Sequence, residues 1–192
     1  MSLVLAIKQG NTVYLASETQ VSSSSLIWHS TRSDQGKLSV VGPFCVGAVG
    51  SLHIHNNVLS SPSLFDVEKE FILTKRWLVE TFLPARDALF KKNKLYSQRA
   101  DGTSYLLYEM MIAHKDRLFS ISDIGTVTEH PYSIAIGSPA DIALCRLEEP
   151  PYPNDVNRSL TEILNYCCEL NDSVSAPYIF IDTKDLIERR VR

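Results

Sequence analysis

The order of apolar patterns along these 192 residues constrains the fold more than any other feature. Short runs of β-prone residues come first, followed by a long stretch of helical spacing, more short runs, helical spacing again and one last run. Strands that return through tight turns pair in antiparallel sheets, and helices cover the apolar faces that remain. The sequence therefore predicts an α+β fold with two antiparallel sheets packed between helical layers.

Each predicted element follows from its local pattern. The expected strands are Leu3–Ile7, Thr12–Ser17, Lys37–Val41, Phe44–Val49, Tyr105–Ala113, Arg117–Ser122, Thr126–Glu129, Tyr132–Ile136 and Tyr178–Ile181. Helical spacing runs from Ser51 to about Asn93, with a short segment near Leu52–Leu59, a break at Pro62 and a further set of apolar residues before Pro84. Later helices are expected after Ser138 as cap with Pro139 at the first position, and over Ser159–Leu170. Turns are predicted at 31–36 and 150–155. No repeat or linker divides the chain, so residues 1–192 are expected to form one domain.

Composition excludes several classes of function. A net charge of −3 gives no electrostatic footprint for nucleic acid. The apolar runs are too short to span a membrane, and the start lacks the basic region of a signal peptide, so we expect a cytoplasmic protein. Scattered cysteines favour reduced thiols, and His53 and His55 have no nearby ligand pattern. Neither a metal nor a cofactor is expected, and no glycine-rich phosphate loop occurs.

Four residues stand in the order that a self-activated hydrolase needs: Ser2, Glu18, Lys37 and Gly47. If Ser2 is the first residue of the mature chain, its free α-amine can accept the proton of its own hydroxyl. A lysine held by a carboxylate lowers the pKa of that amine and stabilises negative charge, and a glycine N–H can bind an oxyanion. Each residue alone is a weak signal, and their combination indicates nucleophilic catalysis.

The motifs resemble those of proteasome β-type subunits and the bacterial HslV peptidase over nearly the whole chain. The resemblance rests on VYLASE, GKL, VGAVGS, RLFSISDIGTVTE, AIGSPADIAL and NDSVSAPYIFI. It implies a four-layer αββα fold of the N-terminal-nucleophile (Ntn) hydrolase type and a protease working as a homo-oligomeric ring. It also implies a peptide or unfolded protein as substrate, and an ATPase unfoldase as a possible partner.

The resemblance also implies a role for each matching residue. Ser2 stands where the family has its nucleophilic threonine, Glu18 where an acid orients the lysine, and Lys37 at the lysine itself. Gly47 would supply the oxyanion N–H. The polar cluster around the amine would comprise Ser138, Asp172 and Ser175.

Structural explanations stay open for the same residues. Ser138 can be only a helix cap, and Asp172 and Ser175 can simply organise a loop. A retained Met1 would block the amine of Ser2, which leaves a non-catalytic ring or scaffold subunit as the alternative to the peptidase. Removal of Met1 and labelling of Ser2 distinguish the two hypotheses.

Overall fold

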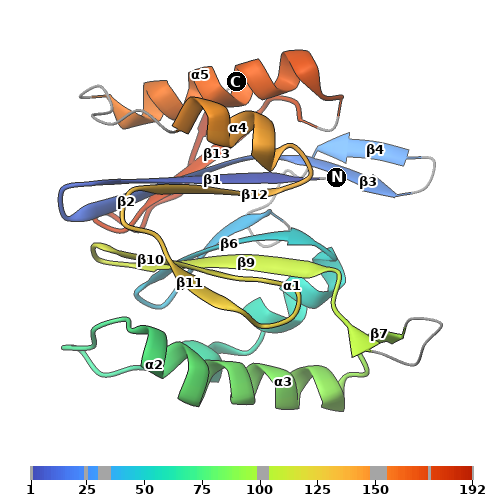
Figure 1. Ribbon diagram of the computed structural model, residues 1–192, viewed down its shortest axis with the longest axis vertical. Coiled ribbons are helices and arrows are strands. Elements are labelled where there is room, and N and C mark those ends of the chain that lie inside the picture. The colour runs from blue at the N-terminus through green and yellow to red at the C-terminus, as the bar shows by residue number, and fades with distance from the viewer. Residues whose placement is uncertain are drawn as a thin grey trace.

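Two five-stranded antiparallel sheets lie face to face at the centre of the molecule, with helices outside both (Figure 1). The structure, a computed structural model, describes residues 2–23, 26–29, 36–98, 104–147, 155–172 and 174–191. Of the turns predicted at 31–36 and 150–155, residues 31–35 and 150–154 lie outside the described ranges, as does Met1. The four-layer αββα arrangement expected from the sequence is confirmed.

The first sheet has the strand order β12-β1-β2-β13-β14. Its strands are β1 (Leu3–Gln9), β2 (Thr12–Glu18), β12 (Ser133–Gly137), β13 (Tyr178–Asp182) and β14 (Arg189–Val191). Gly10, at φ 59°, forms the predicted hairpin turn between β1 and β2. Alternate residues of β1 face opposite sides: Leu3 and Leu5 pack under the helices, whereas Val4 packs against the other sheet. Because both faces are covered, the first five residues of the strand are all apolar and buried.

The second sheet has the order β11-β10-β9-β6-β5. Its strands are β5 (Leu38–Val41), β6 (Phe44–Gly50), β9 (Tyr108–His114), β10 (Arg117–Ile121) and β11 (Val127–Glu129). Phe44 and Val46 of β6 face the helices, and Cys45 between them faces the first sheet. The same alternation as in β1 therefore gives β6 two buried faces.

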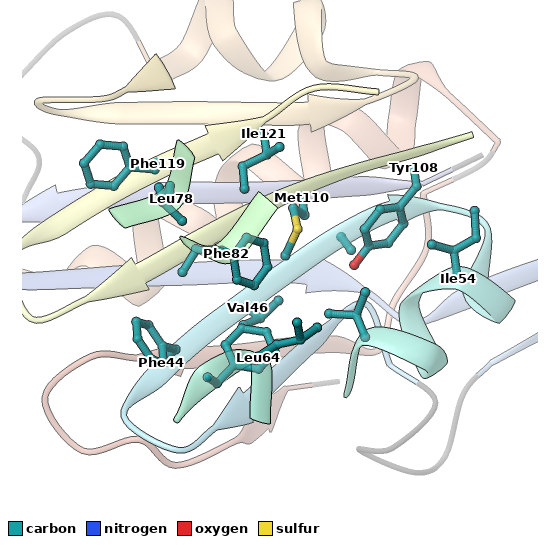
Figure 2. Close-up of a cluster of buried hydrophobic side chains, with 14 of the residues drawn as sticks. Phe44, Val46, Ile54, Leu64, Leu78, Phe82, Tyr108, Met110, Phe119 and Ile121 are labelled. Carbon is teal, nitrogen blue, oxygen red and sulfur yellow. The ribbon is translucent and has the colours of Figure 1, made fainter. Parts of the chain in front are cut away.

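The helices form the two outer layers. Over the first sheet lie α4 (Ala140–Leu147) and α5 (Val156–Leu170), which Asp155 caps through a bond from the Arg158 N–H to Oδ1 at 3.1 Å. The second sheet is covered by α1 (Leu52–Leu59), the 3₁₀ turn η2 (Pro62–Phe65), α2 (Lys75–Trp77), the π turn η3 (Leu78–Phe82) and α3 (Leu83–Lys92). Figure 2 shows side chains of this second layer, including Leu64, Leu78 and Phe82, gathered against strand residues such as Met110.

Three predicted elements are wrong in detail. Residues 66–74 are not helical, whereas the helix that contains Pro84 runs to Lys92, close to the end that the spacing up to about Asn93 predicts. It tolerates Pro84 through the π turn, in which the Leu83 N–H donates to the Leu78 carbonyl five residues earlier, so the regular ladder is already interrupted there. The predicted strand Tyr105–Ala113 is split into β8 (Ser104–Tyr105), which pairs with β7 (Ser97–Gln98), and β9. The predicted cap at Ser138 falls two residues before α4, which begins at Ala140.

Three short strand pairings, that of β7 with β8 among them, had no sequence prediction. Strands β3 (Gln20–Ser23) and β4 (Leu26–His29) form a hairpin, and β14 extends the first sheet at its edge. Among the described residues, no helix is long and apolar enough to cross a membrane.

Candidate active site

Ser2 is seated by the strand that pairs with the start of β1. The Ser138 N–H donates to the Ser2 carbonyl at 3.1 Å, and Leu3 is in register with Gly137. Gly137 has φ 108°, and a Cβ there would lie 1.9 Å from the Ser2 carbonyl oxygen. Only glycine permits this conformation and this close approach. Ser138 thus contacts Ser2 through its main chain.

Glu18, at the end of β2, lies beside the residue that follows Ser2. Its side chain is fully buried, and Oε1 accepts a hydrogen bond from the Leu3 N–H at 3.0 Å. Oε2 accepts from the Gln20 N–H at 2.7 Å. Burial raises the pKa of this carboxyl, and Lys37 opposes that shift. Glu18 is therefore an internal anchor for the N-terminal strand, not a charge at a strand end that faces solvent.

Lys37 completes a buried ion pair with Glu18. Its side chain is 4% exposed, and Nζ donates to Glu18 Oε1. Nζ also donates to the Gln20 carbonyl, at 2.5 Å. Burial lowers the pKa of the Lys37 ammonium, and the charge of Glu18 opposes that shift. The structure thus brings Lys37, Glu18 and the chain beside Ser2 together, as the motif predicts.

Gln20 connects this ion pair to the loop before β13, a role that the sequence analysis missed. Its side-chain Nε2 donates to the Asp172 carbonyl at 3.2 Å, and its Oε1 accepts from Ser175 Oγ at 2.5 Å. Asp172 therefore contributes its main-chain oxygen here, and its side chain is exposed. The predicted polar cluster of Asp172 and Ser175 joins the site through Gln20. The only sequence signal for this role is a polar residue two positions after Glu18.

A cavity of about 340 Å³ opens beside Ser2. Its lining comprises Ser2, Val49, Gly50, Leu106, Leu107, Tyr108, Glu109, Asp123, Gly137 and Ser138. Glu18 and Lys37 are buried, outside this lining. Ser2 therefore borders space that can admit a ligand, and the ion pair lies in the protein interior.

The prediction for Gly47 requires a correction. Gly47 lies within β6, in register with Leu38 on one side and Met111 on the other, and a Cβ on it would meet Val4 and Leu38 side chains at 2.7 and 3.0 Å. It is a packing glycine between the two sheets and is outside the cavity lining. Gly50, at the end of the same strand with φ 96°, lines the cavity with Ser2.

The histidines of α1 do not line this cavity. His55 is buried and hydrogen-bonded to the Tyr108 hydroxyl at 3.0 Å, whereas His53 is exposed. Within the described ranges, no three or more His, Cys, Asp or Glu side chains gather in a way that could hold a metal ion.

Solved structures share this fold over nearly the whole chain. BPH from Thiobacillus denitrificans, in a complex with epoxomicin, is 15% identical with a TM-score of 0.75, and covers 94% of this chain and 97% of that chain. HslV from Trypanosoma brucei is 15% identical with a TM-score of 0.62, covering 94% of this chain and 98% of that chain. The Anbu complex from Pseudomonas aeruginosa, a helical assembly, is 15% identical with a TM-score of 0.72, covering 98% of this chain and 86% of that chain.

No family model and no curated protein sequence matches the chain. At these identities the structural likeness establishes a common fold, and the resemblance to HslV-like, proteasome-type proteins is confirmed at that level.

Proposed function

We propose that this chain is a peptidase of the N-terminal-nucleophile kind, in which the Ser2 hydroxyl attacks the peptide carbonyl after removal of Met1. The observation that carries the proposal is the position of Ser2. It borders a cavity, and the N–H of the next residue donates to Glu18, which is paired with buried Lys37. The shared fold with HslV supports the same reaction class.

In the proposed reaction, the Ser2 hydroxyl oxygen bonds to the carbonyl carbon as its proton passes to the free α-amine of the same residue. The tetrahedral intermediate collapses to an ester, and the leaving amine of the product takes the proton. Water, activated by the same amine, then hydrolyses the ester and regenerates the hydroxyl. Serine in place of threonine lacks the methyl group that restricts χ1, so packing around Ser2 must orient the hydroxyl.

Two groups of this chain would stabilise the reaction. The Gly50 backbone borders the cavity beside Ser2, so we assign to it the oxyanion-binding role expected of Gly47. The Lys37 ammonium, held by Glu18, would favour the neutral form of the Ser2 amine through its positive charge. A neutral amine is the form that can accept a proton.

A covalent label tests the proposal directly. A peptide epoxyketone adds to a terminal residue that offers both a hydroxyl and a free amine, without loss of atoms. Intact mass should show the chain without Met1 before treatment and an increase equal to the whole inhibitor afterwards. The Ser2→Ala variant should process normally and gain no mass. A retained Met1 with no adduct overturns the proposal and supports a non-catalytic subunit of the same fold.

We also propose that the chain acts as a homo-oligomer with a closed ring, serving peptide or unfolded protein substrates in the cytoplasm. The HslV-like fold supports assembly, and the helical assembly of Anbu makes an open helix the competing arrangement. Light scattering of the purified protein distinguishes them, because a ring gives one fixed mass whereas an open helix grows with concentration. An ATPase unfoldase remains a proposed partner, to be tested by stimulated degradation of a folded substrate.

A further inference from the structure

Two carboxylates form an acidic wall in the cavity beside Ser2. Glu109 lies at the start of β9, in register with Val49 on β6, directly before Gly50. Asp123 lies in the turn that follows β10. Both line the cavity, and both are partly buried. The acidic wall therefore faces the same space as the proposed nucleophile.

In the part of the chain that the structure describes, the acidic wall has no basic counterpart. Among the described residues, neither Glu109 nor Asp123 forms an ion pair, and the side chains that line the cavity include no lysine, arginine or histidine. Burial, and to a lesser extent the charge of Asp123, raises the pKa of Glu109. Two partly desolvated carboxylates are unfavourable while the cavity holds no cation. A cation between them would offset both their desolvation and their mutual repulsion.

The missing cation is better supplied by a substrate than by a metal ion. A divalent ion needs at least three protein or water oxygens in a compact shell, and no group of three candidate ligands occurs in the described part of the chain. The cavity volume of about 340 Å³ is at the lower end for a ligand site and suits one side chain. Leu106 and Leu107 add apolar wall, against which the alkyl part of lysine or arginine can pack.

We propose that Glu109 and Asp123 make this cavity selective for peptides that place a cationic group beside Ser2. The inference rests on the proposed peptidase function and adds its substrate class. The cation can be a lysine or arginine side chain, or the free amino terminus of a short peptide. Both are organic ammonium or guanidinium groups that carboxylates bind through charge-assisted hydrogen bonds.

Matched substrates test the selectivity. The panel consists of fluorogenic peptides that differ only at the residue before the scissile bond, with arginine, lysine, glutamine or leucine, each with a free or an acetylated amino terminus. For the native protein, kcat/KM should be about 10- to 100-fold higher for cationic than for neutral members. A preference that survives acetylation identifies the side chain, and one abolished by acetylation identifies the amino terminus.

Variants then assign the preference to the wall. Glu109→Gln, Asp123→Asn and their combination should remove the preference for cationic members, mainly by raising KM for those members. Glu169→Gln, an exposed acid on α5, is the control for net charge and should keep the preference. An equal loss for all substrates, through kcat, would overturn the inference and indicate that the carboxylates instead position the Ser2 amine.

A binding measurement separates this inference from the proposed function. In Ser2→Ala, anisotropy of the same peptides carrying a fluorophore reports affinity without turnover. A cationic preference in binding, with no epoxyketone adduct in the native protein, supports the acidic wall and rejects the peptidase. An adduct on Ser2 with equal affinity for cationic and neutral peptides rejects the acidic wall and supports the peptidase.

Discussion

The Leu3 N–H donates to Glu18 Oε1 at 3.0 Å, and the same oxygen accepts from Lys37 Nζ. One carboxylate oxygen therefore holds both the chain next to Ser2 and the buried ammonium. A change at Glu18 or Lys37 should act on stability and on the position of Ser2 together, because the two functions share an atom.

Lys37→Met should destabilise the protein by about 3–5 kcal/mol, because it leaves the Glu18 carboxylate buried without its cation. Adding Glu18→Gln to Lys37→Met should recover part of that loss, since the buried charge is then removed. Urea unfolding measures both. Glu162→Gln breaks the exposed pair with Arg158 and should cost about 0.5 kcal/mol or less. If the losses of unfolding free energy caused by Glu18→Gln and Lys37→Met were equal and simply added in the double variant, the pairing would be contradicted.

Gly137→Ala should displace Ser2, because its Cβ would collide with the Ser2 carbonyl oxygen. We expect the rate of epoxyketone labelling to fall about 100-fold, in line with the effect of small misplacements on reacting groups. Gly10→Ala is the matched control: its φ is also positive, and nothing lies within 4 Å of the added Cβ. It should cost about 1 kcal/mol in unfolding free energy and leave labelling unchanged. Similar labelling rates for the two variants would refute this role for Gly137.

His55 should make the protein less stable in mild acid. Burial lowers its pKa from 6.5 to about 4, so the unfolded chain binds a proton at a higher pH than the folded chain does. The unfolded state therefore gains stability as pH falls from about 6.5 to about 4, and the cost to folding reaches about 3 kcal/mol. The measurement is the free energy of unfolding from about pH 8 down to about pH 4, a range that brackets the unperturbed histidine pKa of about 6.5. This free energy should fall more steeply with decreasing pH in the native protein than in His55→Gln.

The exposed His53 on the same helix provides the control for that experiment. His53→Gln should keep the native slope, because this change at the surface leaves buried His55 in place. If His55→Gln and the native protein lose stability in parallel, the buried histidine is not the source of the acid sensitivity.

Ser175→Ala should cost about 1–3 kcal/mol, because it leaves Gln20 Oε1 without its donor while Gln20 is only 6% exposed. Gln20→Ala should cost more, since it also removes the bond to the Asp172 carbonyl. The double variant should be little worse than Gln20→Ala alone, because both changes remove the same contact. Strict additivity in urea unfolding would show that Ser175 does not act through Gln20.

Local patterns predicted much of the elements but not all of their boundaries. The alternation of buried residues in β1 and β6 reflects two covered faces, and such a pattern is readable in one dimension. The way in which the helix accommodates Pro84 was not readable, because it depends on the π turn that precedes α3. The candidate site residues Glu18 and Lys37 were found because a lysine held by a carboxylate suits a self-activated hydrolase. The contacts of these two residues with each other and with Leu3 became visible only in the tertiary structure.

The sequence by itself determined the layer order and led to the chemistry proposed for Ser2, since both inferences use residue types and their spacing along the chain. Tertiary structure alone decided which glycine borders the cavity, because Gly47 and Gly50 lie on one strand and differ only in what packs around them. It also decided that Gln20 meets Ser175, which lies 155 residues away, and that Glu109 and Asp123 face one cavity. Contacts of this kind are set by strand register and sheet packing, which no local pattern encodes.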